Sequence, residues 1–211
     1  PATARFAADL ADAVDQPDWM ALQVGELQPS GLMVPRAGFT VPDRNVTLLW
    51  RGESVDLESA VPTHELPVFA EQAGKMLSSV IQRYSKMGHR LALVREAFLD
   101  DLAPEVLNDA PRRLLTEAAL GNVSPFEWDV RVARHVKRRF GSKTEETNTI
   151  TSVHRGPLLK VGSTEQLDRL RFTTDVNTVA SATDARFGSD DVAAFFAASV
   201  DWHLSLGEEI L

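Results

Sequence analysis

The chain has 211 residues, a formal net charge of −8 at pH 7, 44% hydrophobic and 25% charged residues, and no cysteine. This composition is ordinary for a globular protein and excludes disorder along the whole chain. The lack of cysteine excludes disulfides, thiolate nucleophiles, iron–sulfur clusters and cysteine-ligated zinc. No apolar run approaches the roughly 20 residues that cross a bilayer, and the first residues lack the pattern of a signal peptide. We therefore expect a cytoplasmic protein without membrane contact.

The first 60 residues combine one short helix with several strands. Phe6, Leu10 and Val14 recur at helical spacing, which predicts an amphipathic helix over residues 3–14. The residues that follow alternate short apolar segments with turns rich in proline and glycine, a pattern typical of β-strands. The clearest of these strands is the segment NVTLLWRG, which Gly52 closes.

A long amphipathic helix is expected over residues 63–87, where Thr63 suits the N-terminal cap and Gly88 the C-terminal end. The segment HRLALVRE that follows predicts a strand, and the residues after it predict short helical turns that Pro104 and Pro111 break. The apolar stripe of the long helix contains Leu66, Phe69, Ala73, Met76, Leu77, Val80 and Tyr84.

The segment FEWDVRVARHVKRRF begins with a strict alternation of apolar and polar residues, which is the period of a half-buried strand. A helix with Val132, Val136 and Phe140 on one side is the alternative, but the aromatic and β-branched residues favour the strand. The segment GSKT predicts a hairpin to a second strand, EETNTITSVHRG, and RLRFTTDVNTV predicts a third. Ser189 caps a final helix over residues 189–207. The apolar stripe of that helix is Val192, Phe195, Phe196, Trp202 and Leu206.

These elements predict an α+β fold. Strands and helices are segregated along the chain, so most strands are expected to pair antiparallel. We expect a mainly antiparallel sheet packed by the two long amphipathic helices, about residues 63–87 and 189–207. A single domain over residues 1–211 is the simplest organisation for this length, and two similar strand-rich halves, residues 1–122 and 123–211, are the alternative.

Residues 131–140, RVARHVKRRF, hold five basic side chains and no acid within an acidic chain. In a strand these charges fall on both faces, which is typical of an edge strand or of a strand end beyond the core. Basic edges either bind an acidic partner or keep edge strands from associating. Nucleic acid is disfavoured, because the nearby Phe126 and Trp128 are expected on the buried face and not exposed for stacking. The expected partner-binding residues are Arg131, Arg134, Lys137, Arg138 and Arg139.

The sequence contains no GxxxxGK[ST], GxGxxG, HExxH or GxSxG motif, so no cofactor or metal site is predicted. His154 and Arg155 stand out because they precede a Gly-Pro break at a strand end, where functional polar groups often lie. Asp175 and Asn177 share a strand face, but a hard cation needs more carboxylates than this pair supplies. His203, one residue from the apolar stripe of the last helix, is expected on the helix surface or as a hydrogen-bonded core residue. The candidates for a catalytic site are therefore His154, Arg155 and Asp175.

Three pieces of the sequence resemble a family of uncharacterised, sporadically distributed prokaryotic proteins. They are VTLLWRG with the following LPVFAEQAGKMLSSVIQRYSKMGHRLALVRE, the strand LRFTTDVNT, and the closing DDVAAFFAASVDWHLSLGEEI. The chain departs from that family after Arg95, where Glu96 and Ala97 stand in place of the usual Asn or Tyr. The resemblance implies an α+β architecture and assigns no catalytic residue.

The leading hypothesis is a non-enzymatic accessory or interaction protein that binds another macromolecule through the basic strand. A protein partner or self-association is expected, and nucleic acid is the less favoured partner. Two alternatives stay open: a hydrolase or transferase with a site near His154, Arg155 and Asp175, and a module that binds a small ligand between the sheet and the helices.

Overall fold

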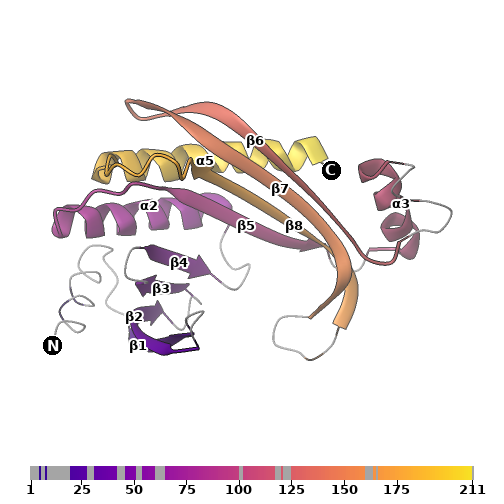
Figure 1. Cartoon of the computed structure of the whole chain (residues 1–211), viewed down its shortest axis with the longest axis horizontal. Helices are drawn as coiled ribbons and strands as arrows, with labels where there is room; N and C mark the ends of the chain where they lie inside the picture. Colours follow the sequence, from indigo (N-terminus) through magenta and orange to yellow (C-terminus); the bar gives the residue numbers. More distant parts are fainter. Residues whose placement is uncertain are drawn as a thin grey trace. The chain divides into compact units, whose positions relative to one another are not determined.

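The computed structural model describes most of the chain (Figure 1). The helix expected over residues 3–14 lies outside the described residues, apart from Arg5 and Ala8, which are helical. The described residues are Arg5, Ala8, 20–27, 31–41, 46–50, 54–59, 65–99, 102–116, Leu120, 125–159, Thr164 and 166–210.

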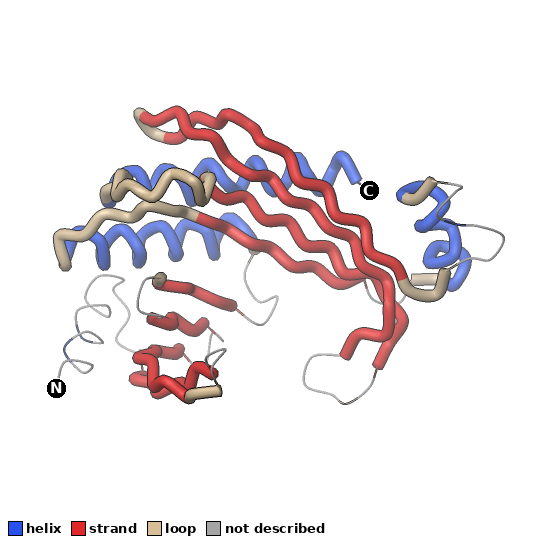
Figure 2. The backbone as a smooth tube through the Cα atoms, viewed as in Figure 1, coloured by secondary structure: helices blue, strands red, loops and turns tan. Residues whose placement is uncertain are grey.

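The fold is α+β, with two antiparallel four-stranded sheets where the sequence predicted one (Figure 2). The first sheet has the order β1-β2-β3-β4, and its strands are β1 (Met20–Leu27), β2 (Met33–Val41), β3 (Val46–Trp50) and β4 (Val55–Ser59). The second has the order β5-β8-β7-β6, and its strands are β5 (Ala92–Leu99), β6 (Trp128–Phe140), β7 (Lys143–Leu159) and β8 (Gln166–Thr178). The sheets are separate because β4 ends the first sheet, while β5 pairs with β8 in the second. The helices are α2 (Leu66–Arg83), α3 (Pro104–Leu114) and α5 (Ser189–Ile210).

The chain forms two compact units, each assembled from segments that are distant in the sequence. Unit 1 comprises Pro1–His89, Phe140–Lys143 and Ala182–Val200, and unit 2 comprises Arg90–Arg139, Thr144–Ser181 and Asp201–Leu211. The first sheet and α2 belong to unit 1, whereas α3 and nearly all of the second sheet belong to unit 2. The single domain, or its halves 1–122 and 123–211, stays a prediction. Within the described residues, no helix has both the length and the apolar character needed to span a membrane.

In unit 1, helix α2 packs against the first sheet. Its Met76 and Val80 contact a core that contains Phe39, Val41 and Leu48 of the sheet. The helix also has Pro67 in its first turn, where the missing N–H breaks no hydrogen bond. The predicted stripe of apolar residues on α2 therefore does face a sheet. Thr63, the expected cap, lies outside the described residues.

Ser85, and not Gly88, ends helix α2. Ser85 has a left-handed backbone with φ of 48°. Its N–H donates to Gln82 O (3.2 Å), and the N–H of Lys86 donates to Ile81 O (2.9 Å), which together form a Schellman motif. Gly88, the residue that the sequence favoured, instead forms an isolated β-bridge with Phe187. The helix therefore ends at a residue that has a Cβ and adopts a backbone conformation better suited to glycine.

We expect the substitution Ser85→Gly to raise the free energy of unfolding by roughly 0.5 to 1 kcal/mol, because it relieves the left-handed strain at this position. Urea denaturation measures the change. Ser79→Gly, in the interior of the same helix, is the control and should be destabilising, since glycine weakens a helix interior. Equal effects at the two positions would show that Ser85 carries no strain.

The start of α5 is stabilised by aromatic contacts and by an acidic side chain. The ring of Phe140 lies 5.3 Å from that of Phe195 in a T-shaped arrangement and 6.0 Å from that of Phe187. Asp191 accepts a hydrogen bond from Gly188 N–H (3.0 Å) and lies 3.5 Å from Lys143 Nζ. A carboxylate in the first helical turn also favours the helix dipole.

In the second sheet, β6 is a strand, as predicted, and a tight turn with Gly141 at φ of 55° connects it to β7. The Gly-Pro break expected after Arg155 is wrong, because β7 continues through Gly156 and Pro157 to Leu159. In this last part β7 pairs with β8, where Pro157 lies opposite Asp168. Proline is tolerated there because β6 begins only at Trp128, so the final residues of β7 have a neighbour on one side.

Helix α3 runs from Pro104 through Pro111 without a break, which corrects the prediction that both prolines interrupt the helix. Pro104 lies in the first turn, where proline is favoured. Pro111 lies inside the helix and cannot donate to the carbonyl of Leu107, four residues earlier. That carbonyl instead accepts a hydrogen bond from Nη1 of Arg155 (2.8 Å). A strand side chain thus replaces the missing helical donor.

Candidate binding site on strand β6

Strand β6 is an edge of the second sheet, and its side chains alternate between two faces. The inner face points toward α3 and the end of α5, and it holds Trp128, Val130, Val132, Arg134, Val136, Arg138 and Phe140. The outer face holds Asp129, Arg131, Ala133, His135, Lys137 and Arg139, all of which are exposed. Since no described strand pairs with the free side of β6, its outward backbone N–H and C=O groups can accept another strand.

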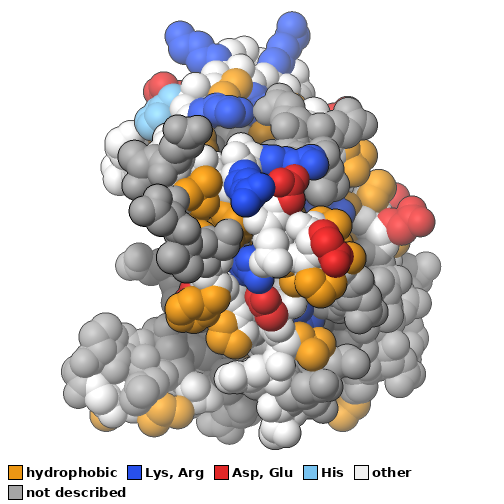
Figure 3. All heavy atoms as spheres, turned by 90° about the vertical axis from the view of Figure 1, so that its right-hand side faces the viewer, with side chains coloured by type: hydrophobic (Ala, Val, Ile, Leu, Met, Phe, Trp, Pro, Cys, Tyr) orange, Lys and Arg blue, Asp and Glu red, His pale blue; other side chains and the backbone are white. Residues whose placement is uncertain are grey.

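The outer face carries a basic row, which we define as Arg131, Lys137 and Arg139. Its other ionisable groups are close to partners on β7: His135 Nδ1 lies 3.5 Å from Glu146 Oε1, and Asp129 Oδ2 lies 3.6 Å from His154 Nδ1. Lys and Arg side chains stand out at the top of Figure 3. The basic row is therefore a set of three exposed positive charges on the outer face of β6.

The other two basic residues of this segment, Arg134 and Arg138, lie on the inner face. The guanidinium of Arg138 is 4.7 Å from the centre of the Trp202 ring and donates to Thr149 Oγ1 (3.1 Å). Arg138 is therefore engaged in packing unit 2, although the sequence grouped it with the partner-binding residues. Arg134 lines a cleft.

The two aromatic residues at the start of this segment differ in exposure. Trp128 is 7% exposed and belongs to a core cluster with Leu107, Val153 and Leu170. Phe126 is 77% exposed, which corrects the expectation that both are buried. The difference arises because β6 begins at Trp128, so Phe126 precedes the alternating part of the strand.

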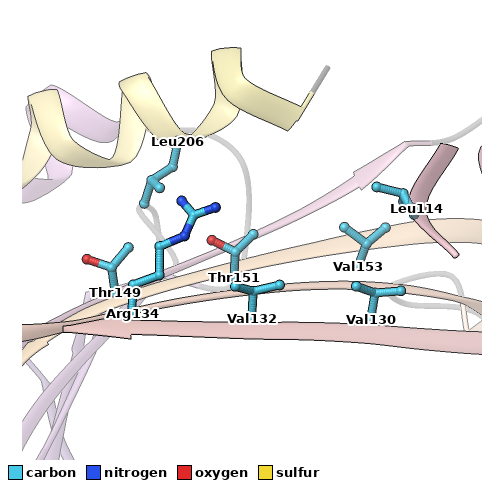
Figure 4. A pocket seen from close by; sticks show the side chains of 8 residues that line it. All are labelled: Leu114, Val130, Val132, Arg134, Thr149, Thr151, Val153 and Leu206. Atoms are coloured by element: carbon cyan, nitrogen blue, oxygen red, sulfur yellow. The ribbon is translucent and has the colours of Figure 1, made fainter. Parts of the chain in front are cut away.

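A cleft of about 200 Å³ lies on the inner face of β6 and β7, within unit 2 (Figure 4). Arg134 and the hydroxyl of Thr151 lie toward its α5 end, beside Leu206, while Val130, Val153 and Leu114 form its other end. The cleft therefore has a polar end and an apolar end. It is lined by Leu114, Val130, Val132, Arg134, Thr149, Thr151, Val153 and Leu206.

The structure does not bring His154, Arg155 and Asp175 together. His154 lies opposite Arg171 and Asp175 lies opposite Ile150, so four residues, about 13 Å of strand, separate them along the sheet. Arg155 is adjacent to His154 in the strand and therefore points to the opposite face. These three side chains cannot act on one substrate atom from these positions.

Arg155 is instead a structural residue of unit 2. Its side chain is 8% exposed, and its Nε and Nη2 donate to the two carboxylate oxygens of Asp168 (3.2 and 2.9 Å). Nη1 donates to Leu107 O, and Nη1 and Nη2 both lie 3.4 Å from Asn108 Oδ1. The guanidinium thus joins β7, β8 and α3.

Asp175 belongs to a ladder of polar side chains. It accepts a hydrogen bond from Asn177 Nδ2 (2.8 Å), and Asn148 Nδ2 donates to Asn177 Oδ1 (3.0 Å). Asp175 and Asn177 share one face, as predicted. Over the described ranges, no group of three or more His, Asp or Glu side chains is placed to hold a metal ion. The ladder supplies a single carboxylate, which accepts from Asn177.

The pKa of His203 is strongly perturbed by its surroundings. It is fully buried, Nε2–H donates to Leu93 O (3.0 Å), and Nδ1 accepts from the hydroxyl of Thr174 (2.6 Å). Burial lowers its pKa to about 4, and the nearby Arg95 and Arg138 act in the same direction, while the hydrogen bond to Leu93 opposes the shift. The neutral form is therefore the folded form. The sequence placed His203 beside an apolar stripe, which allowed a core position but did not indicate its partners.

The residues of the cleft were not predicted as a group. The alternation along β6 could have placed Val130, Val132 and Arg134 on one face, but nothing near them in the sequence indicated that Leu114 and Leu206 would close the sides.

A scan with protein-family models, a search of curated proteins and a search of solved structures found no match to the chain. Fold and site geometry therefore define an α+β protein with a long basic edge strand.

Proposed function

We propose that this chain is a non-enzymatic interaction protein whose β6 edge binds an acidic, extended segment of a protein partner. The observation that supports this most directly is the position of the basic row, Arg131, Lys137 and Arg139, on the exposed face of an edge strand. Edge strands can accept a further strand by backbone pairing, and alternate side chains then confer specificity.

Charge favours an acidic protein segment over two other partners. A second copy would present its own basic row at the same edge, and like charges would oppose that pairing. Self-association therefore uses another surface if it occurs. Nucleic acid needs a wider basic groove with exposed aromatics, whereas the outer face of β6 has no Phe, Tyr or Trp and the chain as a whole is acidic.

The other expectations remain part of this proposal. The cysteine-free sequence fits a reducing compartment, and we propose a cytoplasmic location. The resemblance to sporadically distributed prokaryotic proteins stays a prediction. So do the division into two similar halves and the packing of the second long helix, α5, on a sheet. The hydrolase or transferase alternative has no support from the separated positions of His154, Arg155 and Asp175.

We expect the triple substitution Arg131→Glu, Lys137→Glu and Arg139→Glu to weaken binding of an acidic peptide at least tenfold. Each exposed contact contributes roughly 0.2 to 1 kcal/mol, and charge reversal adds repulsion. The measurement is fluorescence anisotropy with a labelled peptide of alternating Glu and Thr. The matched control is Lys86→Glu, Arg90→Glu and Arg112→Glu, which makes the same change in net charge at other exposed positions.

A second peptide separates strand pairing from simple charge attraction. N-methylation of alternate backbone nitrogens keeps the charge but removes half of the N–H donors, so it should weaken binding if the peptide adds to β6. Equal loss in both triple variants would contradict the assignment to β6. If a labelled single-stranded DNA binds more tightly than the acidic peptide at physiological salt, the partner is a nucleic acid and not a protein.

A further inference from the structure

Strand β1 is an edge of the first sheet (Figure 1). All of its residues pair with β2, from Met20 opposite Thr40 to Leu27 opposite Met33, so the strand is regular along its whole length. No described strand pairs with its other side, which leaves alternate backbone N–H and C=O groups of β1 directed outward. The side chains of Met20 and Leu22 are 57% and 38% exposed. In the described part of the chain this edge is therefore unpaired, and apolar side chains are exposed on it.

The β1 edge lacks the charges that keep edge strands from associating. Its sequence, MALQVGEL, contains one charged residue, Glu26, and no proline. The other three edges of the two sheets differ in this respect: the basic row lies on β6, β4 contains Asp56 and Glu58, and β5 contains Arg95 and Glu96. Charge therefore distinguishes β1 as the edge at which two copies of the chain can meet.

A second copy fits this edge in a specific register. Two copies that form one continuous antiparallel sheet are related by a two-fold axis perpendicular to the sheet, so residues opposite each other lie on the same face. With Gln23 opposite Gln23 of the second copy, position 22 lies opposite position 24, which pairs Leu22 with Val24 on both sides of the axis. Glu26 lies opposite Met20 at the ends of the pairing, and the two Glu26 residues are roughly 20 Å apart along the strands. Apolar residues thus meet apolar residues, and no like charges meet.

We propose that two copies of this chain associate through β1, which joins their four-stranded first sheets into one continuous antiparallel sheet with Gln23 at the two-fold axis. A second copy is favoured over an unrelated strand, because the edge offers a foreign partner little charge for recognition, whereas β1 is complementary to itself. This association is independent of the acidic partner proposed for β6, since β1 belongs to unit 1 and the basic row to unit 2.

Engineered cysteines test the register, because the chain contains no cysteine of its own. Gln23→Cys should form a disulfide-linked dimer on mild oxidation, since the two Cα atoms at the axis are about 5 Å apart. Leu22→Cys and Val24→Cys should not crosslink when each is oxidised alone, because identical positions are then about 8 Å apart, but they should crosslink when the two variants are mixed before oxidation. Gln166→Cys, at an exposed position of β8 in unit 2, is the control and should stay monomeric on a nonreducing gel.

A lysine substitution tests the association without crosslinking. Leu22→Lys should raise the Kd of the dimer about tenfold or more, because it replaces an apolar residue in both Leu22–Val24 pairs. Leu204→Lys makes the same change at a leucine of α5 that is 45% exposed, and it should leave the Kd unchanged. Sedimentation velocity over a micromolar to millimolar concentration series measures both constants.

Leu22→Lys should bind the acidic peptide as the unmodified protein does, so loss of self-association and loss of the acidic partner are separate results. An unmodified protein that sediments as a monomer throughout the concentration series would overturn the proposal. Equal effects of the two lysine substitutions, or a disulfide in Val24→Cys alone, would overturn the pairing of β1 in the stated register.

Discussion

Replacing Arg155 with Met is expected to lower the free energy of unfolding by roughly 3 kcal/mol, because this one side chain joins two strands and a helix of unit 2. The substitution keeps a long side chain but removes every donor of a guanidinium that is 8% exposed. It leaves the carbonyl of Leu107 without a donor, and an unsatisfied buried carbonyl costs about 1 to 3 kcal/mol. It also breaks a nearly buried ion pair, although Asp168, which is 48% exposed, can be partly rehydrated.

Pro111 makes this prediction specific to the link between Arg155 and α3. In the Arg155→Met background, Pro111→Ala restores a helical N–H that can reach Leu107 O. The same substitution in the native background adds a donor to a carbonyl that already accepts from Arg155. A double-mutant cycle should therefore give a favourable coupling of about 1 kcal/mol.

Urea denaturation measures the stabilities, and hydrogen exchange of the α3 amides shows where protection is lost. Arg112→Met, an exposed substitution on α3, is the control and should change stability by less than about 0.5 kcal/mol. Additive effects of Arg155→Met and Pro111→Ala would show that the two residues do not share the Leu107 carbonyl.

Acidification from pH 6.5 to pH 4 is expected to destabilise the protein through His203 by roughly 3 kcal/mol. The pKa of His203 is about 4 in the folded protein, against an ordinary value of 6.5. Between these two pH values His203 is protonated in the unfolded chain and neutral in the folded protein. Proton binding therefore stabilises the unfolded state, and unfolding is favoured as the pH falls. Above pH 6.5 both states are neutral, and the full stability is present. Each pKa unit corresponds to about 1.36 kcal/mol, which sets the size of the effect.

The substitution His203→Gln isolates this contribution. The glutamine amide can donate to Leu93 O and accept from Thr174, but it does not titrate. The free energies of unfolding of the native protein and of the variant should converge as the pH falls from 7.5 to 4.5. The remaining titratable groups are the same in both proteins and affect both equally. If the difference in the free energy of unfolding between the native protein and His203→Gln is the same at every pH, the pKa of His203 is not lowered by folding.

The parts of the fold that were predictable depend on periodicity within one element. The alternation from Trp128 onward correctly identified β6 as a strand, and the apolar stripe of residues 66–83 identified α2. Pro111 was misjudged because its compensation comes from Arg155, which is distant in the sequence. The two sheets were not separable either, because the partner of β5 is β8, and no local pattern specifies that choice.

The candidate site shows the same limit. The identity of the basic residues could be predicted, and their division between two faces follows from the period of a strand. What the sequence could not indicate is the neighbour of each face, since Leu206 approaches Arg134 and Trp202 approaches Arg138 through the tertiary packing of α5. The separation of His154 and Asp175 likewise depends on the register of β7 on β8, which is set along the whole length of both strands.

The pairing of β5 with β8 also has a consequence for biosynthesis. Leu91 and Thr178, which meet beside this pair, are 87 positions apart, so β5 leaves the ribosome long before its strand partner exists. At about 5 to 20 residues per second, the interval is on the order of ten seconds. During that time the backbone N–H and C=O groups of β5 lack the strand that later pairs with them. The pairing of this edge of the second sheet therefore forms only after β8 has been synthesised.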